Sequence, residues 1–212
     1  MKTSRRIGTH RLFLLAAVLA VAVGVGVVWS LTPPGHSHAA SESTTQWHGL
    51  RVYPHNADLS FPVTHTAAQW KQMLTPEQYF ILREAGTEPP FSGSLLNEHQ
   101  AGIFYSAATG EPLFRTATKF DSGTGWPSFY EPIHQSAVVL RWDNSAGMRR
   151  VEVLDSASGS HLGHLFDDGP RPTGLRYCMD SGALLFVPAG GTPPPVVAKY
   201  LEEHPGAIGS NP

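Results

Sequence analysis

The stretch VVLRWDNSAGMRRVEVL, residues 138–154, places a turn between two short apolar runs. The runs at 138–142 and 150–154 have the length of β-strands, and the Asn-Ser-Ala-Gly segment between them has the composition of a turn. This rhythm recurs along the chain and predicts a mainly β fold, with two antiparallel sheets forming a sandwich or a partly open barrel. The further candidate strands are 103–107, 112–116, 164–166, 175–179 and 184–187.

Two short helices are expected at the start of this β domain. Thr66 and Gln69 have the Ser/Thr-x-x-Glu/Gln spacing of a capping box, and Thr75 and Gln78 repeat it. The second helix is expected to end near Gly86, where glycine favours a helix C-terminus.

Composition divides the 212 residues into four parts. Residues 1–31 are expected to be a membrane anchor or signal segment, and 32–64 a flexible linker rich in small and polar residues. Residues 65–190 form the folded domain. Residues 191–212 form a Pro/Gly-rich tail with one helical turn around 196–203.

The N-terminal segment predicts export of the domain. Residues 12–31 are an unbroken apolar stretch preceded by four basic residues. About 20 helical residues at about 1.5 Å each span about 30 Å, the thickness of a bilayer core. The preceding positive charges keep the N-terminus in the cytoplasm. We expect a membrane-anchored protein whose domain is extracytoplasmic. The alternative is signal cleavage near Ala39, which leaves a secreted or periplasmic protein.

Composition also excludes several classes of function. A net charge of −2 gives no electrostatic footprint for nucleic acid. The chain has one cysteine, Cys178, which excludes an internal disulfide framework and a zinc site built on CxxC pairs. The 41% of hydrophobic residues suffices for a folded core.

Cys178 lies in a candidate strand between two charged residues. Side chains alternate along a strand, so Arg176, Cys178 and Asp180 share one face. The positive charge of Arg176 favours a thiolate. The alternative is that the lone cysteine is a small buried hydrophobe.

Two histidines form a second candidate site. His161 and His164 are three residues apart, which does not place both rings on one face of a regular strand, but a turn at Gly163 would bring them together. Paired imidazoles supply general acid or base near neutral pH, or bind a metal, for which Asp168 is the one near third ligand. The alternative is a pair of ordinary half-buried histidines.

Residues 119–129 contain Trp126 and Phe129 on either side of a proline and a serine. They are expected to form either a rigid aromatic wall suited to an apolar or sulfur-bearing ligand, or part of the core.

Taken together, these segments resemble the B-type peptide-methionine (R)-S-oxide reductases. The likeness covers residues 86–188, with 86–91, 119–129, 161–166, 168–170 and 176–178 in the family's order. The family has two antiparallel sheets. The resemblance implies thiol-dependent reduction of methionine-R-sulfoxide, free or in proteins, through a sulfenic acid on Cys178.

The resemblance also implies roles for particular residues. Trp126 packs against the methyl group of the substrate, and Phe166 lies close by. His161 and His164 supply or orient a proton, with Asp168 near them, and Arg176 supports the thiolate. The implied catalytic set is Cys178, His161, His164, Asp168, Arg176 and Asp180.

Two departures from the family concern zinc and the second cysteine. Many members bind structural zinc through two CxxC pairs, where this chain has Ser106-x-x-Thr109 and Asp155-x-x-Ser158. Neither zinc nor another cofactor is therefore expected. Thr124 stands where some members carry a resolving cysteine, so the sulfenic acid requires an external thiol, such as a thioredoxin-like or glutaredoxin-like protein or a small thiol.

The third departure is Asp180, where the family usually has asparagine. An ionised aspartate only accepts hydrogen bonds, and its charge opposes Arg176 and raises the pKa of the thiol.

The expected partners are oxidised proteins or free methionine-R-sulfoxide, an electron donor, and a membrane through residues 12–31, with the chain a monomer. One alternative function is a non-catalytic module that binds a sulfoxide or thioether. Another is a Cys/His hydrolase, which would need an oxyanion hole that the sequence does not reveal.

Overall fold

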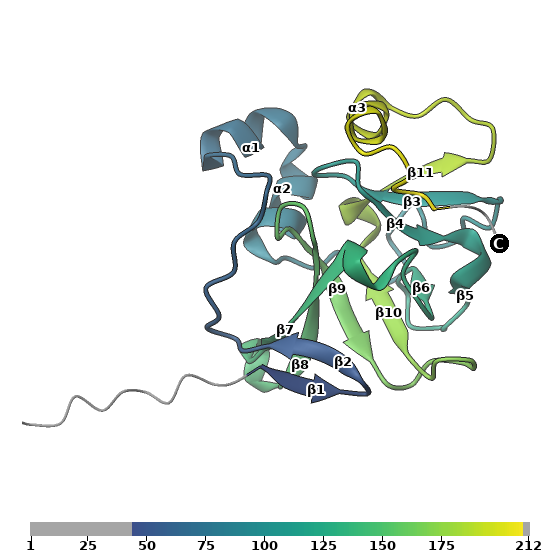
Figure 1. Cartoon of the computed structure of the whole chain (residues 1–212). Helices are drawn as coiled ribbons and strands as arrows, with labels where there is room; N and C mark the ends of the chain where they lie inside the picture. The colour runs from purple at the N-terminus through teal and green to yellow at the C-terminus, as the bar shows by residue number, and fades with distance from the viewer. Residues whose placement is uncertain (1–43, 210–212) are drawn as a thin grey trace, which may run out of the picture. The chain divides into compact units, whose positions relative to one another are not determined.

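The computed structural model describes residues 44–209, which contain two β-sheets and three α-helices (Figure 1). The larger sheet has eight strands in the order β1-β2-β7-β8-β9-β10-β6-β5, and the smaller has the order β11-β3-β4. The strands of the larger sheet are β1 (Thr45–Trp47), β2 (Leu50–Tyr53), β7 (Val138–Asp143), β8 (Arg150–Asp155), β9 (His161–Phe166), β10 (Arg176–Met179), β6 (Ser128–Phe129) and β5 (Lys119–Phe120). Those of the smaller sheet are β11 (Leu184–Pro188), β3 (Gly102–Ser106) and β4 (Pro112–Arg115).

The predicted mainly β fold with two sheets is confirmed, and each of the seven candidate strands is present. Two details differ from the expectation. The larger sheet is mixed, because β2 pairs with β7 in parallel. Within residues 44–209, neither sheet closes into a barrel.

The linker predicted over residues 32–64 is wrong for its second half. β1 and β2 form a hairpin, and β2 extends the larger sheet beyond β7. Val52 is fully buried and lies opposite Leu140, so a short apolar pattern among polar residues is enough to recruit this segment to the sheet.

The two predicted N-terminal helices are α1 (Ala67–Met73) and α2 (Pro76–Glu84). Both begin with the expected capping boxes, at Thr66 and Thr75. A third helix, α3 (Pro195–Glu203), is longer than the single turn expected in the tail and buries Val197 beside the smaller sheet.

No helix within residues 44–209 combines the length and the apolar character needed to cross a bilayer. The anchor or signal segment expected over residues 1–31 lies outside the described residues.

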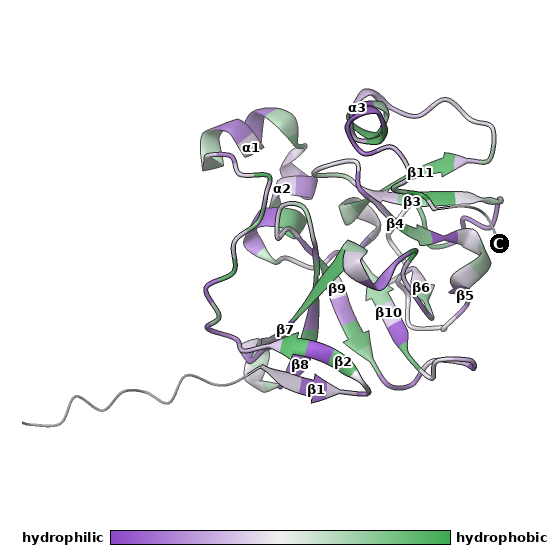
Figure 2. Ribbon diagram, viewed as in Figure 1, coloured by the Kyte–Doolittle hydropathy of each residue, from purple (hydrophilic) through white to green (hydrophobic). Residues whose placement is uncertain are grey.

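One face of β10 lies in the core, and the other face lies at the candidate site. Tyr177 and Met179 are buried among apolar side chains, as strand alternation predicts, and Tyr177 packs near Phe114. Figure 2 shows both hydrophilic and hydrophobic residues along β9 and β10. Cys178 therefore points away from the core, toward the face where the polar residues gather.

Candidate active site

Strand register places Cys178 and His164 side by side. Cys178 on β10 lies directly opposite His164 on β9, and opposite Ser128 on β6 at its other side. His164 in turn lies opposite Glu152 on β8. Directly opposed residues share a face of a sheet, so this row crosses four neighbouring strands on the side away from the core.

The two histidines meet because β9 contains a bulge. Val153 pairs with Gly163 and Leu154 pairs with His161, which leaves Leu162 as an extra residue. One extra residue reverses the alternation of side chains, so His161 and His164 fall on the same face despite their spacing of three. Their ring centroids are 5.2 Å apart. The two rings therefore meet through this bulge rather than through a turn at Gly163.

A ring nitrogen of each histidine forms a hydrogen bond with a carboxylate, and an arginine donates a hydrogen bond to the same carboxylate. His161 Nδ1 lies 2.8 Å from Glu152 Oε1, and Arg141 donates to Glu152 Oε2 at 2.7 Å. His164 Nε2 lies 2.9 Å from Asp143 Oδ2, to which Arg150 donates at 2.6 Å.

The electrostatics of these two trios keep both carboxylates ionised. Burial alone would raise the pKa of Glu152, but the hydrogen bond and charge of His161 and the charge of Arg141 lower it overall. Hydrogen bonds from Ser145, His164 and Arg150 likewise outweigh burial and hold the pKa of Asp143 well below its usual range. Burial lowers the pKa of His164, which favours a neutral imidazole at neutral pH.

The Cys178 thiol is half-buried, and its environment acts in both directions. Burial raises the pKa of Cys178, and Arg176 lowers it only in part. Asp180 adds a small further rise, in the direction expected from its charge. The net direction is opposite to that expected from Arg176 alone, because loss of water outweighs one nearby cation. Thr124 Oγ1 lies 3.9 Å from Cys178 Sγ.

A pocket of about 100 Å³ opens over the thiol. Trp126 forms part of its wall and is oriented by a hydrogen bond from its Nε1 to the carbonyl of Glu88, at 3.1 Å. The pocket is small and aromatic, which suits a methyl thioether or a group of similar size. Its lining residues are Thr87, Trp126, Arg150, Gly163, His164, Phe166, Cys178 and Asp180.

Asp168 does not join the histidines as expected. It forms a bidentate ion pair with Arg176, at 2.8 and 3.0 Å, and that pairing lowers the pKa of Asp168. The Arg176 guanidinium also lies 4.4 Å from the ring centre of Phe166. Asp168 thus orients Arg176 and is not placed as a third ligand for the two histidines.

Asp180 is a buried carboxyl in the pocket wall. Its Oδ1 accepts a hydrogen bond from the Glu88 backbone N–H at 2.9 Å. The Glu88 carboxylate in turn accepts from the backbone N–H groups of Ser181 and Gly182. Burial raises the pKa of Asp180 to about 6.

Sequence reasoning missed Asp143, Arg150 and Glu152, although all three lie in or beside the two runs that define the fold. They face each other across β7 and β8, where Asp143 pairs with Arg150 and Arg141 pairs with Glu152. The sequence did contain a signal for these pairs, because oppositely charged residues stand at equal distances on either side of the turn between β7 and β8. Their meeting with the histidines also required the bulge in β9.

A second polar cluster, which we call the polar clasp, consists of Ser106, Thr109, Asp155 and Ser158. Asp155 is fully buried and accepts hydrogen bonds from the hydroxyls of Ser106 and Ser158, at 2.6 and 2.9 Å. Thr109 is also within hydrogen-bond reach of Asp155, at 3.4 Å. The clasp joins the β3–β4 turn to the β8–β9 turn.

The residues of the polar clasp do not fit a zinc ion. They offer one carboxylate and three hydroxyls that donate to it, in place of the thiolates and imidazoles that zinc prefers. Across residues 44–209, no group of three or more His, Cys, Asp or Glu side chains is placed to hold a metal ion.

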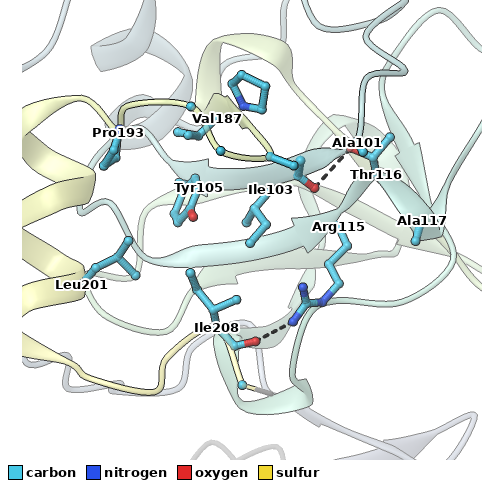
Figure 3. A pocket seen from close by; sticks show the side chains of 16 residues that line it. Ala101, Ile103, Tyr105, Arg115, Thr116, Ala117, Val187, Pro193, Leu201 and Ile208 are labelled. Atoms are coloured by element: carbon cyan, nitrogen blue, oxygen red, sulfur yellow. Dashed lines mark hydrogen bonds between the residues drawn. The ribbon is translucent and has the colours of Figure 1, made fainter. Parts of the chain in front are cut away.

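A larger cavity, of about 850 Å³, lies apart from Cys178 between the smaller sheet and α3 (Figure 3). Its wall includes Ile103, Tyr105, Val187 and Leu201, and the Arg115 guanidinium reaches the carbonyl of Ile208 at its edge. It contains none of the predicted site residues.

The fold and site together define a thiol-based enzyme class: a cysteine faces an oriented imidazole at the base of a small aromatic pocket. Residues 74–188, more than half of the chain, match the SelR domain family. The chain therefore belongs to this family, the B-type methionine-R-sulfoxide reductases.

Curated relatives agree with this assignment. A peptide methionine sulfoxide reductase MsrB of Methanosarcina mazei is 57% identical over 117 residues, covering 55% of this chain and 84% of the relative. The protein of that name from Thiobacillus denitrificans is 56% identical over 123 residues, covering 58% and 93%. That from Leptospira interrogans is 50% identical over 128 residues, covering 60% and 98%.

Proposed function

We propose that this chain reduces methionine-R-sulfoxide to methionine with Cys178 as the nucleophile. The observation that carries the proposal is the direct cross-strand pairing of Cys178 with His164 beneath the pocket. It supports the activity that the relatives' names state, since a sulfur nucleophile and a proton carrier stand where a small thioether-sized group fits.

The reaction transfers one oxygen atom and two electrons. His164, oriented by Asp143, takes the proton from the Cys178 thiol, and the thiolate attacks the sulfoxide sulfur. This attack forms an S–S bond between Cys178 and the substrate. The S–S bond and the S–O bond of the substrate then break as the oxygen forms an S–O bond to Cys178. His164 returns its proton to that oxygen. Methionine sulfur is reduced, Cys178 becomes a sulfenic acid, and no net proton is consumed.

Trp126 and Phe166 are the substrate-contacting aromatics of this proposal. Both line the pocket beside Cys178, which supports packing of their rings against the methyl group. Arg176, held by Asp168, lowers the pKa of the thiol and so supports its ionisation.

Regeneration requires a reductant from outside the chain. Cys178 is the one cysteine, and Thr124 occupies the neighbouring position where a second thiol would resolve the sulfenic acid. Two external thiols reduce the sulfenic acid to the thiol and release one disulfide and one water. A thioredoxin-like protein, a glutaredoxin-like protein or a small thiol each meets this requirement.

We further propose that the enzyme works without structural zinc, since the polar clasp supplies its own cross-link between the two turns. We also propose that residues 12–31 anchor the chain with its catalytic domain outside the cytoplasm, because four basic residues precede that apolar stretch. Reporter fusions after residue 44 that are active only outside the cytoplasm test the orientation. Activity of the reporter inside the cytoplasm would contradict it.

Turnover with separated substrate epimers tests the proposed function. With dithiothreitol as reductant, the full chain is expected to convert a protected methionine-R-sulfoxide and leave the S epimer unchanged. The Cys178→Ser variant is expected to convert neither. Equal activity of that variant, or conversion of the S epimer alone, would refute the proposal.

A further inference from the structure

Two buried polar side chains face each other beside the thiol. Asp180 is 2% exposed and His161 is 3% exposed. Asp180 Oδ2 lies 3.9 Å from His161 Nε2, and that nitrogen has no hydrogen-bond partner within the described residues. Asp180 also lines the pocket above Cys178. A buried nitrogen without a partner is costly, so this arrangement calls for an explanation.

The pair of His161 Nε2 and Asp180 Oδ2 lacks one proton when Asp180 is ionised. The other nitrogen of His161, Nδ1, is 2.8 Å from Glu152, which Arg141 keeps ionised. Nδ1 therefore carries the hydrogen and donates it to Glu152. A neutral His161 then presents a lone pair at Nε2, and an ionised Asp180 presents another at Oδ2. Two lone pairs would oppose each other inside the protein, and one added proton removes that repulsion.

We propose that the pair formed by Asp180 and His161 holds one proton, which lies on Asp180 Oδ2 when substrate is bound, and that Asp180 uses it to donate a hydrogen bond to the sulfoxide oxygen of the substrate. The inference rests on the proposed function and adds a specificity device to it. A sulfoxide accepts this hydrogen bond through its oxygen, whereas the thioether product has no such oxygen. Substrate is thus bound in preference to product while the proton is present.

The charges around Asp180 agree with a retained proton. Burial raises the pKa of Asp180 to about 6, and the Glu88 carboxylate also raises it, against the lowering effects of the Glu88 N–H group and of His161. Cys178 and His164 are the other titratable groups of the pocket lining. A carboxyl in this setting gains a proton on mild acidification and loses it on the alkaline side.

Arg150 is the competing donor. It also lines the pocket, and its Nε is buried without a hydrogen-bond partner among the described residues. Its guanidinium is permanently charged, so hydrogen bonding from Arg150 would not depend on pH. The two donors are therefore distinguished by the pH dependence of substrate binding.

Binding to an inert variant provides the test. The affinity of full-length Cys178→Ser for a protected methionine-R-sulfoxide is measured by calorimetry between about pH 5 and about pH 8. We expect Kd to rise about tenfold per pH unit above the midpoint at which the pair loses its proton. Adding Asp180→Asn is expected to abolish the slope, because its amide donates at every pH.

Glu111→Gln, added instead to Cys178→Ser, is the matched control. Glu111 is a second buried carboxyl that titrates near neutrality, with a pKa that burial raises to about 7, and it is absent from the pocket lining. This control is expected to keep the full slope. A Kd that does not vary with pH in Cys178→Ser would assign the hydrogen bond to Arg150. A slope that persists with Asp180→Asn would equally overturn the proposal.

Infrared spectroscopy supplies a readout that needs no substrate. In otherwise unaltered protein with ¹³C-labelled aspartate, we expect a protonated-carboxyl band at about pH 5 that loses intensity in Asp180→Asn, whereas any contribution from Asp155, whose pKa burial also raises, is the same in both proteins. A band of equal intensity in the two proteins would refute the shared proton even if methionine is formed. Failure of every variant to bind sulfoxide, with the band present, would instead count against the proposed function and against hydrogen bonding to the substrate.

Discussion

Replacing Glu111 by glutamine is expected to stabilise the protein above neutral pH and to leave it unchanged in acid. Glu111 is buried, and its carboxylate accepts hydrogen bonds from the Ser156 hydroxyl at 2.6 Å and the Ala157 N–H at 3.1 Å. These bonds do not compensate for burial, which raises the pKa of Glu111 from 4.5 to about 7. The carboxyl thus binds its proton more tightly in the folded chain than in the unfolded chain.

The pKa values of Glu111 in the unfolded and folded chain fix the magnitude and the sign of the change in stability. A rise from 4.5 to about 7 corresponds to about 3.5 kcal/mol, at about 1.4 kcal/mol per pH unit. Stability of the unaltered protein is full below about pH 4.5, falls as the pH rises to about 7, and stays lower above it. A glutamine side chain removes this loss because it never ionises.

Urea unfolding followed by tryptophan fluorescence measures the difference. The free energies of unfolding of Glu111→Gln and the unaltered chain are expected to agree within about 1 kcal/mol near pH 4. Near pH 8 the variant is expected to be more stable by about 3 kcal/mol. Glu202→Gln, at an exposed position on α3, removes the same charge and is expected to change stability by less than about 0.5 kcal/mol. A difference that is the same at both pH values, or a variant less stable at pH 8, would refute the reasoning.

Three further predictions concern the site and the polar clasp. Asp143→Asn removes the carboxylate that orients His164 and is expected to lower kcat by about 10²–10³-fold with little change in KM; an unchanged kcat in steady-state assays would show that the orientation does not matter. Thr124→Cys is expected to form an internal disulfide with Cys178 after one turnover, detected as loss of both free thiols, and retention of both thiols after methionine release would contradict the geometry. Prolonged treatment with a zinc chelator is expected to leave the thermal unfolding midpoint within about 1 °C, because the polar clasp uses hydrogen bonds alone; a large fall would show that a metal holds these turns.

Most of the strands and helices that pack the core were predictable because they carry their own local signal. The runs at 138–142 and 150–154 flank a turn, and Thr66 and Thr75 begin helices through capping boxes that need only four residues. β5 and β6 were not predicted, because two-residue strands are too short to show a period. β1 and β2 were missed because their burial depends on a distant neighbour, β7.

The chemistry-bearing residues were predictable from the resemblance, but their partners were not. Alternation correctly placed Cys178 away from Tyr177 and Met179. The bulge at Leu162 depends on register with β8, which no local pattern reveals. For that reason the sequence predicted Asp168 as the carboxylate beside the two histidines, whereas Glu152 and Asp143 are their hydrogen-bond partners. The dominance of burial over Arg176 in setting the thiol pKa likewise depends on packing rather than on sequence neighbours.

The most direct test of the central claim is the amount of methionine formed by prereduced enzyme without any reductant. The account predicts about one methionine per chain from protected methionine-R-sulfoxide, because each chain has one cysteine and no internal thiol to restore it. The accompanying loss of the Cys178 thiol and its trapping by a sulfenic-acid reagent complete the expected result. Formation of no methionine with the thiol intact would contradict the account.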